Sequence, residues 1–120
     1  MHIACELIIT VLLHSPAAPS PPESLQPLSI SARNITVTWD LPLNPNGIIS
    51  FYQIELMSAD GSITQQNSTQ TVAAFTNLSP SAPYSIKVQA FTVEFGEFGP
   101  VLMVSTLAGE RLHTTPVIYL

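Results

Sequence analysis

Two carboxylates in one loop are the nearest approach in this sequence to an acid–base pair. Glu94 and Glu97 lie three residues apart, and neighbouring carboxyl groups with different pKa values are what general acid–base catalysis uses. The simpler interpretation, which we favour, is a pair of solvated surface charges. The three histidines, His2, His14 and His113, all lie in the terminal tails. A Ser-His-Asp arrangement therefore cannot assemble in the middle of the chain, and the sequence predicts neither an enzyme nor a catalytic residue.

Metal, nucleotide and disulfide chemistry have equally little support. Cys5 is the single cysteine, so an internal disulfide and a cysteine-based zinc site are excluded. The paired Asp or Asn ligands of a calcium site are missing. No glycine-rich loop leads from an expected strand into a helix, so there is no phosphate cradle. We expect no metal and no cofactor.

Three sequons are the residues that could carry a covalent modification. They are Asn34-Ile35-Thr36, Asn67-Ser68-Thr69 and Asn77-Leu78-Ser79. N-glycosylation requires the secretory route and an exposed acceptor. Asn67 is the strongest candidate because its polar surroundings predict a loop, whereas Asn34 begins an expected strand and a proline follows the sequon of Asn77. Chance is the alternative, but three sequons in one small domain favour an extracellular protein.

The composition fits one domain with a lightly charged surface. The chain has 120 residues, of which 46% are hydrophobic, and this is enough to build a single core. Only 9% are charged, against about 25% in ordinary soluble domains. With a net charge of -5 and three Lys and Arg residues, the chain cannot neutralise a run of phosphates or form a polybasic patch. We therefore expect that the domain binds neither nucleic acid nor a membrane directly.

Both ends of the chain differ from its middle. Residues 3–13 are mostly apolar but too few to cross a bilayer, which takes about 20 apolar residues. A secretory signal is one interpretation; a non-native start is the other, because His2 and Glu6 stand where a signal carries basic residues. Prolines between residues 16 and 27 predict an extended linker. We expect residues 1–20 to be this leader and linker, residues 21–107 one domain, and residues 108–120 a flexible tail.

The middle of the chain alternates apolar and polar residues with period two, which is the mark of a half-buried strand. The alternation covers residues 35–40, 51–56, 84–91 and 102–104, with shorter runs at 28–30 and 72–75. Asn46-Gly47 and Asp60-Gly61 are turn signals between the runs. Six or seven short strands without a helical pattern predict an antiparallel sandwich.

The order of these motifs resembles the fibronectin type III domain. Trp39-Asp40-Leu41-Pro42, Asn46-Gly47-Ile48 and Tyr52 are similar to that family's B-strand tryptophan, B–C loop and C strand, and Leu78-Ser79-Pro80 with residues 84–90 to its E–F corner and F strand. The resemblance implies an all-β fold, a seven-stranded immunoglobulin-like antiparallel β-sandwich. It implies structural core positions for Trp39, Tyr52, Leu78 and Tyr84. It also implies that the Tyr84 hydroxyl reaches back to the backbone across the E–F turn.

Residues 92–99 are the expected contact loop. Phe95, Glu97 and Phe98 lie there, and exposed aromatic side chains are typical binding anchors. The resemblance implies the same, since this loop is a frequent contact site in the family. The alternative is that a phenylalanine packs back over the edge of the core. Phe51 and Phe91 point away from the core by parity and are a second candidate patch, against a neighbouring module.

The expected function is extracellular protein–protein recognition or adhesion, by one repeat of a larger cell-surface receptor or matrix protein. The sequence is similar in style to the repeats of receptor-type tyrosine phosphatases and cell-adhesion receptors. The partners would be other proteins: an extracellular ligand or neighbouring fibronectin-like repeats. One alternative is a mechanical or structural spacer without a ligand of its own. Two others are a cytokine-receptor-like domain, whose disulfides and Trp-Ser-x-Trp-Ser signature are missing, and an intracellular fibronectin-like module.

Overall fold

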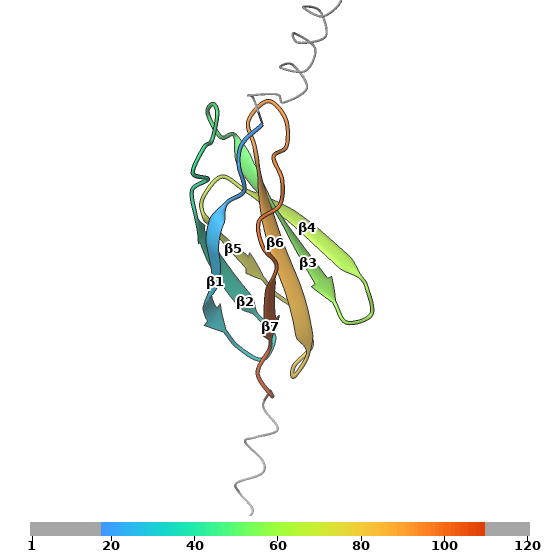
Figure 1. Cartoon of the computed structure of the whole chain (residues 1–120). Helices are drawn as coiled ribbons and strands as arrows, with labels where there is room; N and C mark the ends of the chain where they lie inside the picture. Colours follow the sequence, from blue (N-terminus) through green and yellow to red (C-terminus); the bar gives the residue numbers. More distant parts are fainter. Residues whose placement is uncertain (1–17, 110–120) are drawn as a thin grey trace, which may run out of the picture.

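Seven strands make up the regular structure of residues 18–109, the part of the chain that the computed structural model describes (Figure 1). The expectations for the leader, for Cys5, for the three histidines and for the end of the tail lie outside these residues. The strands are β1 (Glu23–Ile30), β2 (Ile35–Asp40), β3 (Phe51–Ser58), β4 (Ile63–Ser68), β5 (Val72–Phe75), β6 (Pro83–Phe91) and β7 (Leu102–Ser105). Within the described range there is no helix of the length and hydropathy that crossing a membrane requires.

The strands form two antiparallel sheets. One has the order β1-β2-β5 and the other the order β4-β3-β6-β7, with every pairing antiparallel. The two sheets stack face to face, and residues 18 and 109 lie at opposite ends of the sandwich (Figure 1). The predicted seven-stranded antiparallel sandwich is confirmed.

The core fills the space between the sheets with the alternate residues that the period-two pattern singles out. They are Ile35, Val37 and Trp39 from β2, Tyr52, Ile54 and Leu56 from β3, Ala73 and Phe75 from β5, and Tyr84, Ile86, Val88 and Ala90 from β6. Trp39 is 2% exposed, and its ring meets that of Tyr52 edge-on at 5.3 Å between centroids. Leu78 is partly buried and packs against the same cluster. The indole Nε1 of Trp39 is buried without a hydrogen-bond partner among the described residues.

The polar stretch around Asn67 is a strand, so the prediction of a loop there was wrong. β4 pairs with β3 alone, with Asn67 opposite Gln53 and Gln65 opposite Glu55. No residue of β4 is buried on either face of the strand, so the strand needs no apolar alternation. The period-two signal was therefore absent from a segment that is extended nonetheless.

A hydrogen-bonded corner fixes the far end of the sandwich. The Tyr84 hydroxyl accepts a hydrogen bond from the Ser79 N–H at 2.9 Å, across the turn between β5 and β6. The Thr106 hydroxyl donates to the Ser79 carbonyl at 2.6 Å and accepts from the Ala82 N–H at 3.0 Å. These bonds join the β5–β6 connection to the end of β7. The corner thus positions β6, the strand from which the candidate surface is built.

Candidate interaction surface

Three phenylalanines form an aromatic cluster on the outer face of the four-stranded sheet. Phe51 of β3 and Phe91 of β6 are paired in register, and their rings stack at 4.9 Å with an interplanar angle of 20°. Phe95 returns from the following loop and meets both rings edge-on, at 5.9 Å from Phe51 and 4.9 Å from Phe91. Such geometries add about 0.5–1.5 kcal/mol per pair to the burial of the rings. Phe95 nevertheless stays 43% exposed, so the cluster presents an aromatic surface to solvent.

The loop that carries Phe95 is held in place by the chain that leads into β1. Pro19 and Pro22 are buried against it. A Cβ added at Gly96 would lie 2.1 Å from the Pro19 carbonyl oxygen, and one at Gly99 would lie 2.7 Å from that of Pro22. Both positions therefore require glycine because the backbones approach so closely. The Gly96 N–H also donates to the carbonyl of Ala90 at 2.9 Å, which ties the loop to β6.

The same leading segment is also bonded to the loop between β2 and β3. The Ser20 N–H donates to the Asn44 carbonyl at 2.9 Å, and the Asn44 N–H donates to the Ser20 hydroxyl at 2.8 Å. Asn46 donates from its side-chain amide to the Ala18 carbonyl at 2.9 Å. The β2–β3 loop and the β6–β7 loop, which lie at the same end of the sandwich (Figure 1), thus share the leading segment as a common support.

The three expected contact residues of the loop differ in their surroundings. Phe95 both packs against the aromatic cluster and remains accessible, so it combines the two roles that the sequence set as alternatives. Phe98 is partly buried, and its ring lies under the Lys87 ammonium at 4.3 Å from the centroid. Glu97 is exposed. Phe51 and Phe91, the second candidate patch, join Phe95 in one surface, which parity alone did not indicate.

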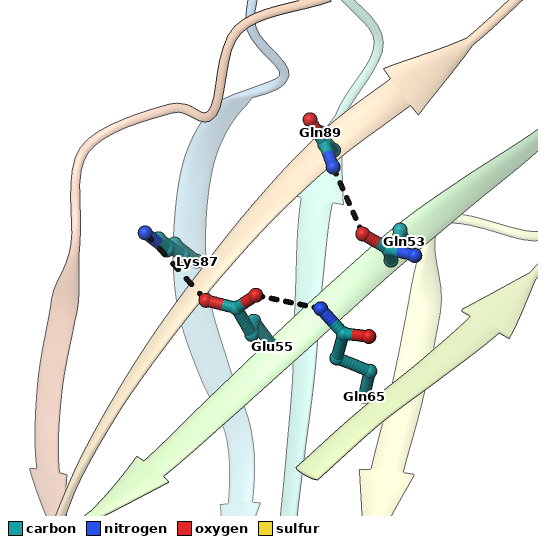
Figure 2. Close-up of polar contacts among 5 residues, drawn as sticks. All are labelled: Gln53, Glu55, Gln65, Lys87 and Gln89. Carbon is teal, nitrogen blue, oxygen red and sulfur yellow. Dashed lines mark hydrogen bonds and ion pairs between the residues drawn. The ribbon is translucent and has the colours of Figure 1, made fainter. Parts of the chain in front are cut away.

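Below the aromatic cluster, a polar belt crosses the same face (Figure 2). Gln89 on β6 donates from its side-chain amide to Gln53 on β3 at 2.9 Å. In the next row Glu55 accepts from the Gln65 side chain at 2.7 Å and meets the Lys87 ammonium at 3.6 Å. Lys87 is 37% exposed, so this ion pair contributes at most about 1 kcal/mol. The belt neutralises its own charge and separates the aromatic cluster from the far end of the sheet.

An apolar groove occupies that far end. It has a volume of about 320 Å³ and is lined by Glu55, Met57, Ile63, Ser85, Lys87, Val101 and Met103. Met103 is 71% exposed and Ile63 55%. The outer face of the four-stranded sheet therefore carries two apolar areas on either side of a polar belt.

Two titrating groups of the described residues have clearly shifted pKa values. The hydroxyl of Ser58, followed by the N–H of Ser62, lowers the pKa of the exposed Asp60 carboxyl from 3.8 to about 2. Burial raises the pKa of the Tyr52 hydroxyl. Among residues 18–109 no group of three or more His, Cys, Asp or Glu side chains could hold a metal ion. What this arrangement offers is contact, by aromatic rings and amides.

The three candidate glycosylation sites are spread over the domain. Asn34, Asn67 and Asn77 are all exposed. Asn34 immediately precedes β2, Asn67 lies on the edge strand β4, and Asn77 lies in the turn after β5.

Known proteins share both the sequence pattern and the fold. The fibronectin type III domain matches residues 20–104 of the chain. Ephrin type-A receptor 7 of Gallus gallus is 30% identical over 95 residues, which are 76% of this chain and 10% of the receptor. Phosphatidylinositol phosphatase PTPRQ of Homo sapiens is 32% identical over 96 residues, 80% of this chain and 4% of the phosphatase. The chain thus spans a tenth or less of these two relatives.

A solved structure, the twitchin kinase region from C. elegans, aligns with a TM-score of 0.71 at 20% identity, over 78% of this chain and 18% of that one. At this identity the likeness shows the fold alone.

Proposed function

The chain belongs to the fibronectin type III family, and from that premise we propose that the domain is an extracellular protein–protein recognition module, one repeat of a larger cell-surface receptor or matrix protein. The fold of this family is non-catalytic, so the domain acts by contact. Its relatives include a protein named as an ephrin receptor, which supports a setting at the cell surface. The low charge and the three sequons support the same setting.

The aromatic cluster is the observation that carries the proposal. A surface of three phenylalanine rings is expensive to leave in water, and aromatic anchors beside a polar rim are typical of protein interfaces. Phe95 stays accessible while its neighbours Phe51 and Phe91 hold it in one orientation. A preorganised aromatic anchor loses little side-chain entropy on binding. The partner is therefore a protein with an apolar contact area, approaching the loop at residues 92–99.

The test is a binding screen of the whole chain, displayed in multivalent form, against a collection of receptor and matrix ectodomains. Phe95→Ser is the disabling variant, and Met103→Ala is its matched control, because Met103 is also exposed but lies beyond the polar belt. We expect a binder of the wild type that the control retains and Phe95→Ser loses at least tenfold. Thermal unfolding of each variant is measured alongside. A binder that tolerates Phe95→Ser in a folded protein would contradict recognition through this cluster.

A mechanical spacer repeat without its own ligand is the second candidate. The arrangement of the domain favours it, because residues 18 and 109 lie at opposite ends, as an end-to-end array requires (Figure 1). The fold is also similar to that of a twitchin region. Single-molecule stretching distinguishes the two functions when it is combined with the screen. High unfolding force with no binder in the screen would favour the spacer.

A further inference from the structure

We infer that Asn67 carries an N-linked glycan and that its sequon is the one that stays accessible once the sandwich has folded. The inference rests on the proposed extracellular setting, because this modification occurs along the secretory route. The oligosaccharide comes from a lipid-linked pyrophosphate donor. A bond forms between the Asn67 amide nitrogen and the anomeric carbon of the innermost sugar, while the bond from that carbon to the pyrophosphate oxygen breaks. The amide nitrogen gives up one proton, and the lipid pyrophosphate leaves.

Asn67 lies where the chain can be approached without opening the core. It is exposed near the end of β4, a strand that pairs with β3 alone. Its side chain is on the outer face, because its partner in register is Gln53 of the polar belt. Thr69, which supplies the sequon hydroxyl, is exposed just past the end of the strand. The Ser68 hydroxyl, in the middle of the sequon, lies 3.0 Å from the carbonyl oxygens of Gln70 and Val72 and accepts from the Gln70 N–H at 3.1 Å. Opening this sequon therefore breaks these local bonds and the pairing of one strand end, and local opening of this kind costs far less than global unfolding.

The Asn34 sequon is closed by folding. Its middle residue, Ile35, is 0% exposed and belongs to β2, which lies between β1 and β5. The Asn34 N–H donates to the Ser31 hydroxyl at 3.1 Å, and the Asn34 carbonyl accepts from the Ser31 N–H at 2.9 Å. Presenting this sequon in an extended form would require β2 to leave the centre of its sheet.

The Asn77 sequon is held by the hydrogen-bonded corner. Asn77 has a left-handed backbone with φ of 58°. The N–H of Leu78 donates to the Arg33 carbonyl at 2.9 Å, and the N–H of Ser79 donates to the Tyr84 hydroxyl at 2.9 Å. A proline at residue 80 follows directly. An extended, accessible form of this sequon is incompatible with the corner that ties β6 to β7.

A glycan on Asn67 would also decide from which side a partner can approach. Asn67 lies opposite Gln53 of the polar belt. Phe51 lies two residues before Gln53 on the same face of β3, so it is a diagonal neighbour of Asn67. The oligosaccharide would therefore cover the β4 side of the aromatic cluster. Phe95 and its loop, next to the leading segment, would remain open.

The test expresses residues 1–120 in mammalian cells behind a foreign cleavable secretory signal, so that the result does not depend on the chain's own leader. Asn67→Gln and Thr69→Ala remove the sequon in two different ways, and Asn34→Gln and Asn77→Gln are matched controls. Intact mass is measured before and after enzymatic removal of N-glycans, and peptide mass gives the occupancy of each site. We expect the highest occupancy at Asn67, retained in both controls and lost in both Asn67-sequon variants.

Occupancy at Asn34 or Asn77 that equals or exceeds that of Asn67 would overturn the inference while leaving the extracellular setting intact. A secreted product without any glycan would overturn it as well. Recognition would still stand or fall by the Phe95→Ser binding result, because the wild type, Phe95→Ser and Met103→Ala in that screen all keep the same three sequons. The two proposals can therefore fail separately.

Discussion

Replacing Tyr84 by phenylalanine tests the hydrogen-bonded corner without disturbing the packing around it. The ring is 6% exposed and keeps its place in the core, so the substitution removes only the hydroxyl. That hydroxyl is the acceptor for the Ser79 N–H at 2.9 Å. A net hydrogen bond contributes about 0.5–1.5 kcal/mol, and a buried donor left without an acceptor costs about 1–3 kcal/mol. Because this bond is only partly buried, we expect a loss of about 1–2 kcal/mol.

Urea unfolding followed by tryptophan fluorescence measures this loss. Trp39 is the single tryptophan of the chain and lies in the core, so its emission reports global unfolding. With a urea m-value of about 1–3 kcal/mol/M for a small domain, the midpoint should fall by about 0.3–2 M with an unchanged slope. The melting temperature should fall by about 4–16 °C, since each kcal/mol corresponds to about 4–8 °C in a domain of this size.

Tyr52→Phe is the matched control, because it removes the same atom from an equally buried ring. Tyr52 is 3% exposed, and its hydroxyl makes no hydrogen bond to any other described residue. We expect a change in the free energy of unfolding within about 0.5 kcal/mol, the usual range away from specific interactions. Equal losses for the two variants would refute the reasoning, because they would show that the corner bond contributes nothing beyond a generic hydroxyl.

Three further predictions concern other parts of the domain. Hydrogen bonds lower the pKa of Asp60 from 3.8 to about 2, so the stability that this carboxylate contributes is present above pH 4 and is lost as the pH falls to 2. Asp60→Asn should remove this pH-dependent component when melting temperatures are measured across this range. An unaltered pH dependence in the variant would contradict the prediction. Gly96→Ala places a Cβ 2.1 Å from the Pro19 carbonyl oxygen and should cost about 1–3 kcal/mol in urea unfolding, whereas an unchanged midpoint would mean that this packing is loose in solution. Trp39→Ala should cost about 3–5 kcal/mol in calorimetry. Trp39→Phe should cost clearly less, because the phenyl ring keeps much of the buried volume, and equal costs would show that filling the space between the sheets contributes nothing at this position.

The alternating strands were predictable because each has one face in the core. In β2, β3 and β6 the buried and less buried positions alternate without a break. A one-residue shift of such a strand would put its apolar set in water, so the pattern fixes the face and the fold class together. The edge strand β4 has no such face, since five of its six residues are polar, and its pairing with β3 depends on backbone bonds that leave no mark on residue type.

The aromatic cluster was predictable only in pieces. Parity put Phe51 and Phe91 outside the core, but their stacking depends on the register of β3 with β6, which brings residues 51 and 91 opposite each other. Phe95 joins them because the loop turns back at residue 95 to bridge with Phe91. That turn depends in turn on the close approach of Gly96 to Pro19, far away in the sequence. Long-range packing of this kind has no local signal. The glycines and prolines of the two segments are compatible with a close approach of their backbones, but they do not indicate which segments meet.

The chain segments that enter and leave the sandwich are hydrogen-bonded to it, so the domain and these two segments move as one rigid body. The bonds of residues 18–20 to the β2–β3 loop set the direction in which the chain enters. At the other end Leu107 is bonded through its N–H to Ser31 and through its carbonyl to Ser81, at 3.0 and 2.8 Å. These bonds therefore leave no place for a hinge at the two points where residues 18–107 meet the rest of the chain. A rotation of the domain relative to the adjoining chain would move the aromatic cluster together with the whole sandwich. The length and stiffness of that adjoining chain would therefore set which partners the cluster can reach.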